Sequence, residues 1–267
     1  MLNDITLGQY FPVDSKLHRM DPRSKILLLI LHIVAIFLAN NMAGYILVTL
    51  FTLVIMFLSR VPAKMYFRGL KPVLFVIVFT ALLNIFLTPG TKIELFNYKT
   101  PMTWEGLILA GKMALRLVLL IITSSALTYT TSPIILTDGI EKLLSPFAKL
   151  GLPTYELAMM MSIAIRFIPT LIEETDKIMK AQKARGADFE SGSVIRRVKA
   201  LAPMLIPLFI SAFRRADELA VAMESRCYQG GNKRTRLNEI HFSSVDFVAA
   251  FIFLLFFAAL ITIRILF

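Results

Sequence analysis

Residues 70–88 read LKPVLFVIVFTALLNIFLT and contain no charged side chain after Lys71. A helix of about 17–25 apolar residues is long enough to cross the hydrocarbon core of a bilayer. Four further stretches are similarly apolar: 24–39, 43–58, 106–130 and 244–267. Because a spanning backbone has to satisfy its own hydrogen bonds, we expect all five stretches to be helices. The sequence therefore predicts an all-α integral membrane protein with about five transmembrane helices.

The composition of the whole chain points the same way. Hydrophobic residues occupy 57% of the 267 positions, which is too apolar for an ordinary soluble domain. The first two apolar stretches lie on either side of Asn40-Asn41, so we expect a tight helical hairpin there. Cys227 is the only cysteine, which excludes an intrachain disulfide and is compatible with a reducing compartment.

Positive charges are concentrated in particular segments of the chain, whose formal net charge is +11. They precede the first apolar stretch and follow the second: Lys16, Arg19, Arg23, Lys25, Arg60, Lys64, Arg68 and Lys71. The connections 40–44 and 89–105 contain two lysines and no arginine. The positive-inside rule then predicts that the N-terminus and the 59–71 loop are cytoplasmic. Since topology accounts for the basic excess, we expect a lipid bilayer and no nucleic acid as partner.

This topology divides the chain into three parts. Residues 1–130 form an N-terminal cytoplasmic segment and the first four transmembrane helices. Residues 131–243 return to the cytoplasm as a coupling domain with long helices. Residues 244–267 form the last transmembrane helix, which leaves the C-terminus outside the cell.

The polar segment 131–243 contains two apolar runs, 157–172 and 200–213, that could also be spans. Two spans there would leave the seven Lys and Arg residues of 173–199 outside, against the positive-inside rule. They would also place Arg166 at membrane depth, which is costly. We therefore favour long helices that lie on or partly in the inner membrane interface.

Three such helices can be delimited from capping signals. The first covers 138–149, with Asp138 as N-cap and Glu141 as its capping-box partner. The second covers 154–186 and the third covers 193–226, each ending near glycine. At 1.5 Å per residue the last two are roughly 45–50 Å long. The predicted fold is thus five transmembrane helices with a cytoplasmic or interfacial domain of three coupling helices.

The ends of the two longest helices carry related sequences. Residues 175–186 read TDKIMKAQKARG and residues 216–227 read ADELAVAMESRC. Three residue types recur 41 positions apart, as Asp176, Ala181 and Arg185, and as Asp217, Ala222 and Arg226. The alanine and arginine share a helical face, where a partner backbone can approach the alanine while the guanidinium forms directed bonds. A single arginine there could merely stabilise the helix dipole, but two matching ends favour partner binding.

Three motifs in order carry a family resemblance. Residues 18–25 read HRMDPRSK, residues 165–169 read IRFIP and precede Glu173-Glu174, and residues 181–186 read AQKARG. In this order they resemble the transmembrane subunit of energy-coupling factor (ECF) transporters, which are bacterial importers of vitamins and metals. The resemblance covers nearly the whole chain.

The resemblance implies partners for the two helix ends. The six residues concerned are Ala184, Arg185, Gly186, Ser225, Arg226 and Cys227. The first three match the family's first short arginine motif, whereas the last three keep only the central arginine of the second. Each motif is implied to insert into one of two ATP-binding-cassette ATPases. The long helices are implied to pass ATP-driven motion to a separate substrate-binding membrane subunit, for uptake of vitamins or other micronutrients across the bacterial cell membrane.

We expect the chain itself to be a non-catalytic subunit without a cofactor, with ATP hydrolysed by the partner subunits. It lacks the G-x-x-x-x-G-K-[ST] phosphate-binding loop. Its three histidines, at positions 18, 32 and 241, are too far apart in sequence to predict a metal site.

The substrate-binding subunit should pack on apolar faces of the long helices and be exchangeable. Candidate contacts are Met159, Met160, Met161 and Met204, because flexible methionine-rich surfaces can repack against different partners. The alternative is that these methionines belong to the core or face lipid.

Three of the polar residues within predicted spans have candidate roles. Lys112 and Arg116 either extend to the outer interface or face a neighbouring helix or the substrate-binding subunit. Asn84 is a candidate for a hydrogen bond between helices.

Two other classes of protein were weighed. A permease of a conventional ABC importer, which forms the substrate path itself, is the alternative function. Such permeases resemble one another in an E-A-A-x3-G-x9-I-x-L-P loop, which the spacing from Gly186 to Ile206-Pro207 does not fit. A membrane enzyme would need clustered ionisable residues within its spans, and these spans supply hardly any acid.

Overall fold

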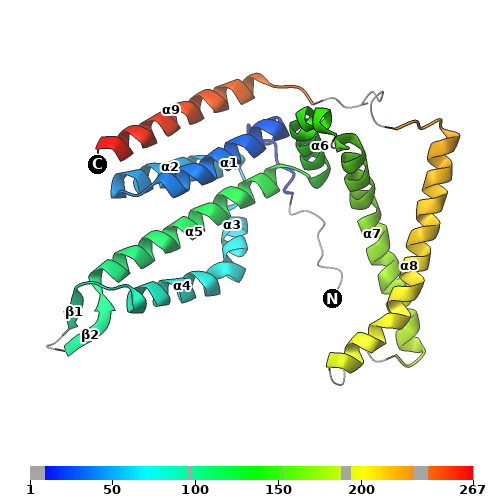
Figure 1. Ribbon diagram of the computed structural model, residues 1–267, viewed down its shortest axis with the longest axis horizontal. Helices are drawn as coiled ribbons and strands as arrows, with labels where there is room; N and C mark the ends of the chain where they lie inside the picture. Colours follow the sequence, from blue (N-terminus) through cyan, green and yellow to red (C-terminus); the bar gives the residue numbers. More distant parts are fainter. Residues whose placement is uncertain (1–9, 96–97, 152, 188–193, 231–239, 267) are drawn as a thin grey trace. The chain divides into compact units, whose positions relative to one another are not determined.

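The secondary structure is almost entirely helical. The computed structural model describes residues 10–266, apart from 96–97, 152, 188–193 and 231–239. The helices (Figure 1) are α1 (Pro22–Leu38), α2 (Met42–Ser59), α3 (Ala63–Leu70), α4 (Leu74–Leu87), α5 (Trp104–Thr130), α6 (Pro133–Leu144), α7 (Thr154–Ala184), α8 (Val194–Ser225) and α9 (Ser244–Leu266). Short 3₁₀ turns, Lys71–Val73 and Ser145–Leu150, follow α3 and α6. The predicted all-α class is confirmed.

Within the described residues, five helical segments are long and apolar enough to cross a membrane. Four of them correspond to predicted spans: α2, α3 with α4, α5 and α9. The fifth is α7, which we expected at the membrane interface. Helix α1, also predicted to span, has 17 residues and is at the lower limit of spanning length. The prediction of about five spanning helices is confirmed by length and composition.

A two-stranded β-hairpin joins α4 to α5. Its antiparallel strands are β1 (Lys92–Leu95) and β2 (Tyr98–Thr103), in a segment that we expected to be a plain connection. Thr103 then caps α5, because its side chain accepts a hydrogen bond from the Gly106 amide at 3.2 Å. Thr103 is therefore both the last residue of β2 and the N-cap of α5.

The described chain divides into two compact units. The first contains residues 10–139 and 240–266, and the second contains residues 140–230. The boundary falls within α6, and α9 packs with the first unit. The three-part division predicted from the sequence refers to sides of the membrane and stays a prediction.

The core of the first unit lies among α1, α2, α5 and α9. Its buried hydrophobic residues are Ala35, Ile36, Ala39, Tyr45, Val48, Leu119, Phe253, Phe256 and Leu260. Gly44 of α2 lies against α9, and a Cβ atom there would meet the Leu260 side chain at 3.5 Å, an ordinary van der Waals distance. Small residues at such positions give the close helix packing that is typical of membrane bundles.

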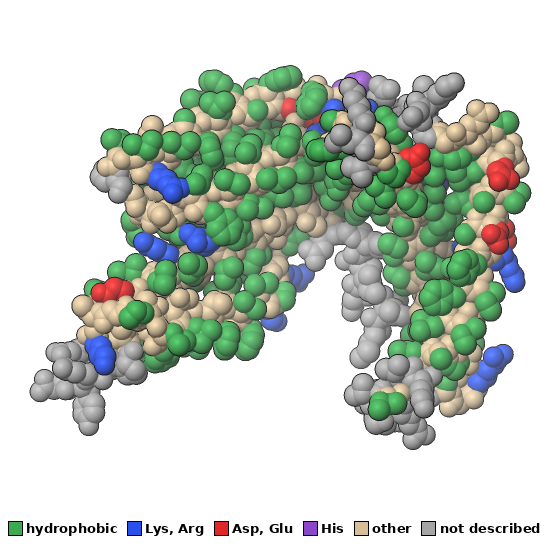
Figure 2. All heavy atoms as spheres, viewed as in Figure 1, with side chains coloured by type: hydrophobic (Ala, Val, Ile, Leu, Met, Phe, Trp, Pro, Cys, Tyr) green, Lys and Arg blue, Asp and Glu red, His purple; other side chains and the backbone are tan. Residues whose placement is uncertain are grey.

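Helix α4 packs along α5 but leaves most of its surface exposed. A Cβ atom added to Gly106 would lie 2.7 Å from the Asn84 carbonyl oxygen, so only glycine fits at this contact. The Asn84 side chain donates to the Thr80 carbonyl of its own helix at 2.8 Å rather than to a neighbouring helix. Figure 2 shows hydrophobic side chains over the surfaces of α4 and α9. Lipid or a membrane partner has to cover them.

Helix α6 begins earlier than the sequence analysis predicted. Pro133 occupies the first helical position, where its missing amide costs nothing, and the Leu136 amide donates to the Ser132 carbonyl at 2.9 Å. Asp138 therefore lies inside the helix, and its predicted role as N-cap is wrong. After α6 the chain continues as a 3₁₀ turn, because Pro146 cannot donate a helical hydrogen bond.

Helices α7 and α8 agree with the predicted long helices to within two residues at each end. They contain 31 and 32 residues, which correspond to about 45–50 Å each. Figure 1 shows them crossing within the second unit.

Candidate partner-binding site at the ends of α7 and α8

Helix α7 ends in a Schellman motif, a cap in which two backbone hydrogen bonds close the last turn. The Gly186 amide donates to the Lys183 carbonyl and the Ala187 amide donates to the Gln182 carbonyl, each at 3.0 Å. Gly186 has a φ of +87°, a left-handed conformation that glycine adopts without steric cost. The backbone thus fixes Arg185 at the cap position.

Helix α8 ends in the same motif. The Cys227 amide donates to the Glu224 carbonyl at 2.8 Å, and the Tyr228 amide donates to the Met223 carbonyl at 3.1 Å. Cys227 has a φ of +58°, although this conformation costs a residue with a side chain roughly 1–2 kcal/mol. Both caps contain the same two Schellman bonds, with Arg226 in the position of Arg185. The sequence repeat is therefore also a repeat of backbone geometry.

The predicted binding residues of both caps are accessible. All six are exposed: Ala184, Arg185, Gly186, Ser225, Arg226 and Cys227. Ala181 and Ala222, one turn before the arginines, are exposed as well. Among the described residues, neither cap arginine has a side-chain hydrogen bond or ion pair. Both guanidinium groups are thus available to a partner.

The repeated aspartates do not share a role. Asp176 forms an ion pair with Lys180 at 2.7 Å, four residues along α7. The corresponding position after Asp217 is Val221, which cannot form this pair. The arginine, the exposed alanine one turn before it and the cap geometry are therefore the features common to both ends.

Helices α7 and α8 run antiparallel, because their contacts pair in reverse order. Near the end of α7 the Gln182 side-chain amide donates to the Pro203 carbonyl near the start of α8, at 3.3 Å. In the middle, Glu174 accepts a hydrogen bond from Ser211 and pairs with Arg215 at 3.1 Å. The two capped ends consequently lie at opposite ends of the helix pair.

These contacts centre on Ile172 of α7 and Phe213 of α8. Gln182 lies ten residues after Ile172, and its partner Pro203 lies ten residues before Phe213. Ile172 and Phe213 are themselves 41 residues apart, which is the spacing of the sequence repeat. The helix pair therefore has approximate two-fold symmetry about its crossing point. Arg185 and Arg226 each lie 13 residues beyond the centre, roughly 20 Å along their helices.

The crossing is held by opposite charges at equivalent positions of the repeat. Glu174 and Arg215 are 41 residues apart and so occupy equivalent positions of the repeat. If the repeat were exact, both positions would carry the same charge and would repel each other at the crossing. Their ion pair and the hydrogen bond from Ser211 instead join the helices. On one side of the crossing, an apolar cavity of about 240 Å³ lies between the helices, lined in part by Phe167 and Leu219.

The predicted methionine surface is only partly accessible. Met160 and Met161 are exposed, and Met159 is half-buried. Met204 is 9% exposed, so its side chain offers little surface in this conformation, and its contact role stays a prediction.

The N-terminal motif contributes a polar clamp whose partners the sequence analysis did not find. The Asp21 side chain caps α1 and pairs with Arg23 at 2.8 Å, while the Asp21 amide donates to buried Asp246 at 2.9 Å. Lys25 is buried and donates to the carbonyl of Thr130 at 3.0 Å. Because the partners lie more than 100 residues away, only the motif itself was visible in the sequence. The clamp joins the start of α1 to the start of α9 and the end of α5.

The segment before the clamp is ordered by His18. Its Nε2 donates to the Phe11 carbonyl at 2.9 Å, because a carbonyl can only accept, and its Nδ1 therefore accepts from the Ser15 hydroxyl at 2.7 Å. Burial lowers the pKa of the ring below its ordinary value of 6.5. The neutral imidazole thus fits its surroundings.

Lys112 and Arg116 contact neighbouring parts of the chain, as one of the sequence alternatives predicted. The Lys112 ammonium donates to the Asn40 carbonyl at 3.2 Å. The Arg116 guanidinium donates to the Tyr45 hydroxyl at 2.9 Å and lies 5.3 Å from the centre of the Phe37 ring. Both cations therefore tie α5 to the α1–α2 hairpin.

Comparison with known proteins shows the family of the chain. A family model described as CbiQ, cobalt transport protein, matches residues 14–237. The energy-coupling factor transporter transmembrane protein EcfT of Clostridium kluyveri is 57% identical over 251 residues, covering 94% of this chain and 93% of the relative. The chain belongs to this transporter family. Members named EcfT in Acidaminococcus fermentans and Bacillus subtilis are 51% and 50% identical, over 99% and 92% of this chain and 98% and 93% of their own lengths.

Family membership establishes the coarse function. The family consists of transmembrane subunits of ECF transporters, so the chain is a component of a multi-subunit transporter. Bacterial relatives and five long apolar helices identify a multi-pass protein of the cell membrane. Transmembrane subunits of this kind are generally not catalytic.

Proposed function

We propose that this chain is the coupling subunit of an ECF-type importer, joining two ATPase subunits to a separate substrate-binding membrane subunit. The carrying observation is the pair of matching Schellman caps, with exposed Arg185 and Arg226, at opposite ends of an antiparallel helix pair. A two-fold arrangement of binding ends is complementary to a pair of similar subunits.

Each cap has the chemistry to dock into a groove of an ATPase. The guanidinium can make several directed bonds to carboxylates or carbonyls. The exposed alanine one turn earlier, Ala181 or Ala222, leaves room for the backbone of the partner. The rigid cap limits the conformational entropy lost when the arginine binds.

The crossing provides a route for coupling. When ATP binding draws two ATPases together, the helix ends attached to them move toward each other, and α7 and α8 rotate about the contacts of Glu174. This rotation changes the apolar surface around the crossing and around Met160 and Met161. A substrate-binding subunit packed there, dedicated or exchangeable, would be driven between conformations. The imported substrates would be vitamins or other micronutrients.

Charge reversal at the two caps tests the proposal. We expect Arg185→Glu combined with Arg226→Glu to abolish ATPase binding and substrate uptake, while the chain still inserts into the membrane. Lys177→Glu is the matched control, because Lys177 is an exposed cation on α7 two turns before the cap. Full assembly and uptake in the double variant would refute the docking role of the caps.

The copy number separates this function from that of a conventional ABC permease. A purified complex with one copy of this chain and two ATPase subunits supports coupling between separate subunits. Two copies of this chain per complex would favour the permease, in which the substrate path is formed by the membrane subunits themselves.

The proposal also requires both caps on the cytoplasmic side, together with the N-terminus and residues 131–243, and the C-terminus outside. The native chain has one cysteine, Cys227, at the end of α8. A Cys227→Ser, Ala184→Cys variant moves the thiol to the end of α7. We expect a membrane-impermeant maleimide to label both proteins only in inside-out vesicles. Labelling from opposite sides would contradict the proposed orientation.

A further inference from the structure

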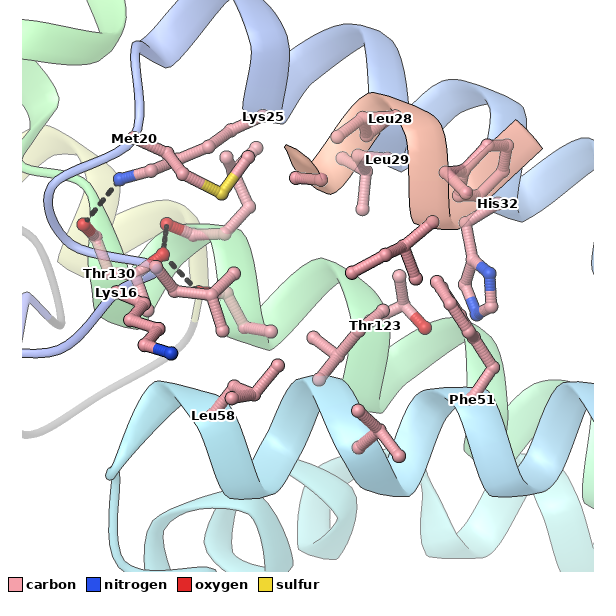
Figure 3. A pocket seen from close by; sticks show the side chains of 18 of the residues that line it. Lys16, Met20, Lys25, Leu28, Leu29, His32, Phe51, Leu58, Thr123 and Thr130 are labelled. Atoms are coloured by element: carbon pink, nitrogen blue, oxygen red, sulfur yellow. Dashed lines mark hydrogen bonds between the residues drawn. The ribbon is translucent and has the colours of Figure 1, made fainter. Parts of the chain in front are cut away.

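The first unit contains an apolar pocket of about 300 Å³ between α1, α2, α5 and α9 (Figure 3). This volume is at the lower end of the range for ligand pockets. Its walls come from the first half of α1 and α9 and from the second half of α2 and α5. The pocket therefore lies toward one end of the helical bundle rather than at its centre.

The two ends of the pocket differ in chemistry. Figure 3 shows Lys16 and Lys25 at one end and His32 and Phe51 at the other. The lining residues that the structure describes include no aspartate or glutamate. The mouth beside the lysines carries the exposed Lys16 ammonium, and the rest of the wall is almost entirely hydrocarbon.

The two lysines have different roles at the mouth. Lys25 is buried, and its ammonium donates to Thr130, Thr131 and the His18 carbonyl, so its donors are occupied. Lys16 is exposed and has no partner among the described residues. It can therefore offer all three of its donors to an anionic ligand.

The far end of the pocket is closed by a fixed aromatic cluster. The Thr52 hydroxyl donates to the Val48 carbonyl at 2.9 Å, so the contact of 3.0 Å between Thr52 and His32 Nε2 requires the imidazole to donate. The Phe51 and Phe256 rings pack against His32 with centroids 5.4 and 5.7 Å from its own. From Lys25 to His32 the wall is about 10 Å long, within the roughly 15 Å thickness of one hydrocarbon leaflet.

We propose that this pocket binds an anionic phospholipid of the surrounding bilayer. One acyl chain fills the apolar cavity as far as His32, and the phosphate lies at the mouth against the Lys16 ammonium. Hydrocarbon is the solvent at this depth, so an acyl chain is the natural occupant of a cavity with hydrocarbon walls. This site is independent of the proposed ATPase docking.

A tryptophan introduced at the far end of the pocket provides a direct reporter. The chain has one tryptophan, Trp104 at the start of α5, so a protein with Trp104→Phe and Phe51→Trp carries its only indole in the pocket. This full-length reporter protein is placed in phosphatidylcholine vesicles that contain increasing fractions of lipid with brominated acyl chains. The brominated lipid is either phosphatidylglycerol or phosphatidylcholine, and quenching of the indole fluorescence reports its occupancy.

We expect brominated phosphatidylglycerol to quench with about five-fold higher apparent affinity than brominated phosphatidylcholine, the preference that one interfacial lysine provides. Lys16→Gln should reduce this ratio to about one, whereas Lys64→Gln, at an exposed lysine outside the pocket, should leave it unchanged. Ala249→Leu, which fills the pocket wall, should weaken quenching by both lipids. Ala250→Leu is its control, because Ala250 is exposed and does not line the pocket.

Equal quenching by the two brominated lipids would overturn the anionic site, as would a preference that Lys16→Gln leaves intact.

If the reporter protein fails to fold, native mass spectrometry of the transporter complex without the tryptophan substitutions replaces it. One retained phosphatidylglycerol that Lys16→Gln removes supports the proposal, and a complex without retained lipid refutes it. Lipid bound by the isolated chain but absent from the complex would show that a partner helix occupies the pocket instead.

Discussion

Replacement of Asp246 with alanine tests how α9 is held to the N-terminal motif. The Asp246 side chain is 3% exposed and accepts hydrogen bonds from the amides of Asp21, at 2.9 Å, and Ser243, at 2.7 Å. Alanine leaves both donors without a partner, at a cost of about 1–3 kcal/mol for each buried group. Because Ser243 is only half-buried, we expect the free energy of unfolding to fall by about 2–5 kcal/mol. Asp246→Asn keeps one acceptor oxygen and should lose less.

Thermal unfolding of the detergent-solubilised protein measures this effect. For a chain of this size about 2–4 °C of Tm corresponds to each kcal/mol, so Asp246→Ala should lower Tm by roughly 5–15 °C. Ser244→Ala is the matched control, because Ser244 is the exposed first residue of α9 and should change Tm little. A Tm for Asp246→Ala within about 2 °C of the control would refute the clamp.

Three further outcomes are expected. Glu174→Arg or Arg215→Glu alone should reduce uptake per ATP hydrolysed, and the two changes together should restore part of this uptake. Full coupling in either single variant would argue against the crossing as a pivot. Cys227→Gly should raise the free energy of unfolding by up to about 1 kcal/mol, because glycine adopts the left-handed conformation without steric cost. ATPase binding should be kept. Weaker binding would instead indicate that the thiol contacts the partner. Burial lowers the pKa of His18, so the neutral ring contributes stability that is present above pH 6.5 and lost at lower pH. His18→Asn should therefore flatten this part of a plot of Tm against pH. An unchanged slope would contradict the role of His18.

The long helices were predictable because strong local signals mark their ends. Pro153 precedes α7 and Gly186 follows it, and both boundaries lie within two residues of the prediction. The start of α6 was missed because the Asp138 and Glu141 pair imitates a capping box, while Ser132 and Pro133 are an equally good start signal five residues earlier.

The sequence repeat singled out the residues of the candidate site, whose binding role stays a prediction, but it did not reveal their geometry. Arg185 and Arg226 were found from the repeat, and their exposure agrees with the predicted role. The antiparallel direction of α7 and α8, seen in the contact of Gln182 with Pro203, could have been expected from the short connection between the two helices. No sequence pattern, however, fixes the point at which they cross. The Asp246 clamp lay beyond reach, because its partner Asp21 is 225 residues away and neither residue shows a pairing pattern.

The apolar composition of α7 can be reconciled with a role outside the membrane core. Its capped end and that of α8 lie at opposite ends of an antiparallel pair about 45–50 Å long. If that pair crossed a bilayer with a hydrocarbon core of about 30 Å, Arg185 and Arg226 would emerge on opposite sides. Two ATPases that use cytoplasmic ATP could then not bind both ends. The proposed coupling therefore requires the pair to lie along the inner interface, where the apolar surface of α7 contacts lipid and the substrate-binding subunit while both arginines remain in the cytoplasm.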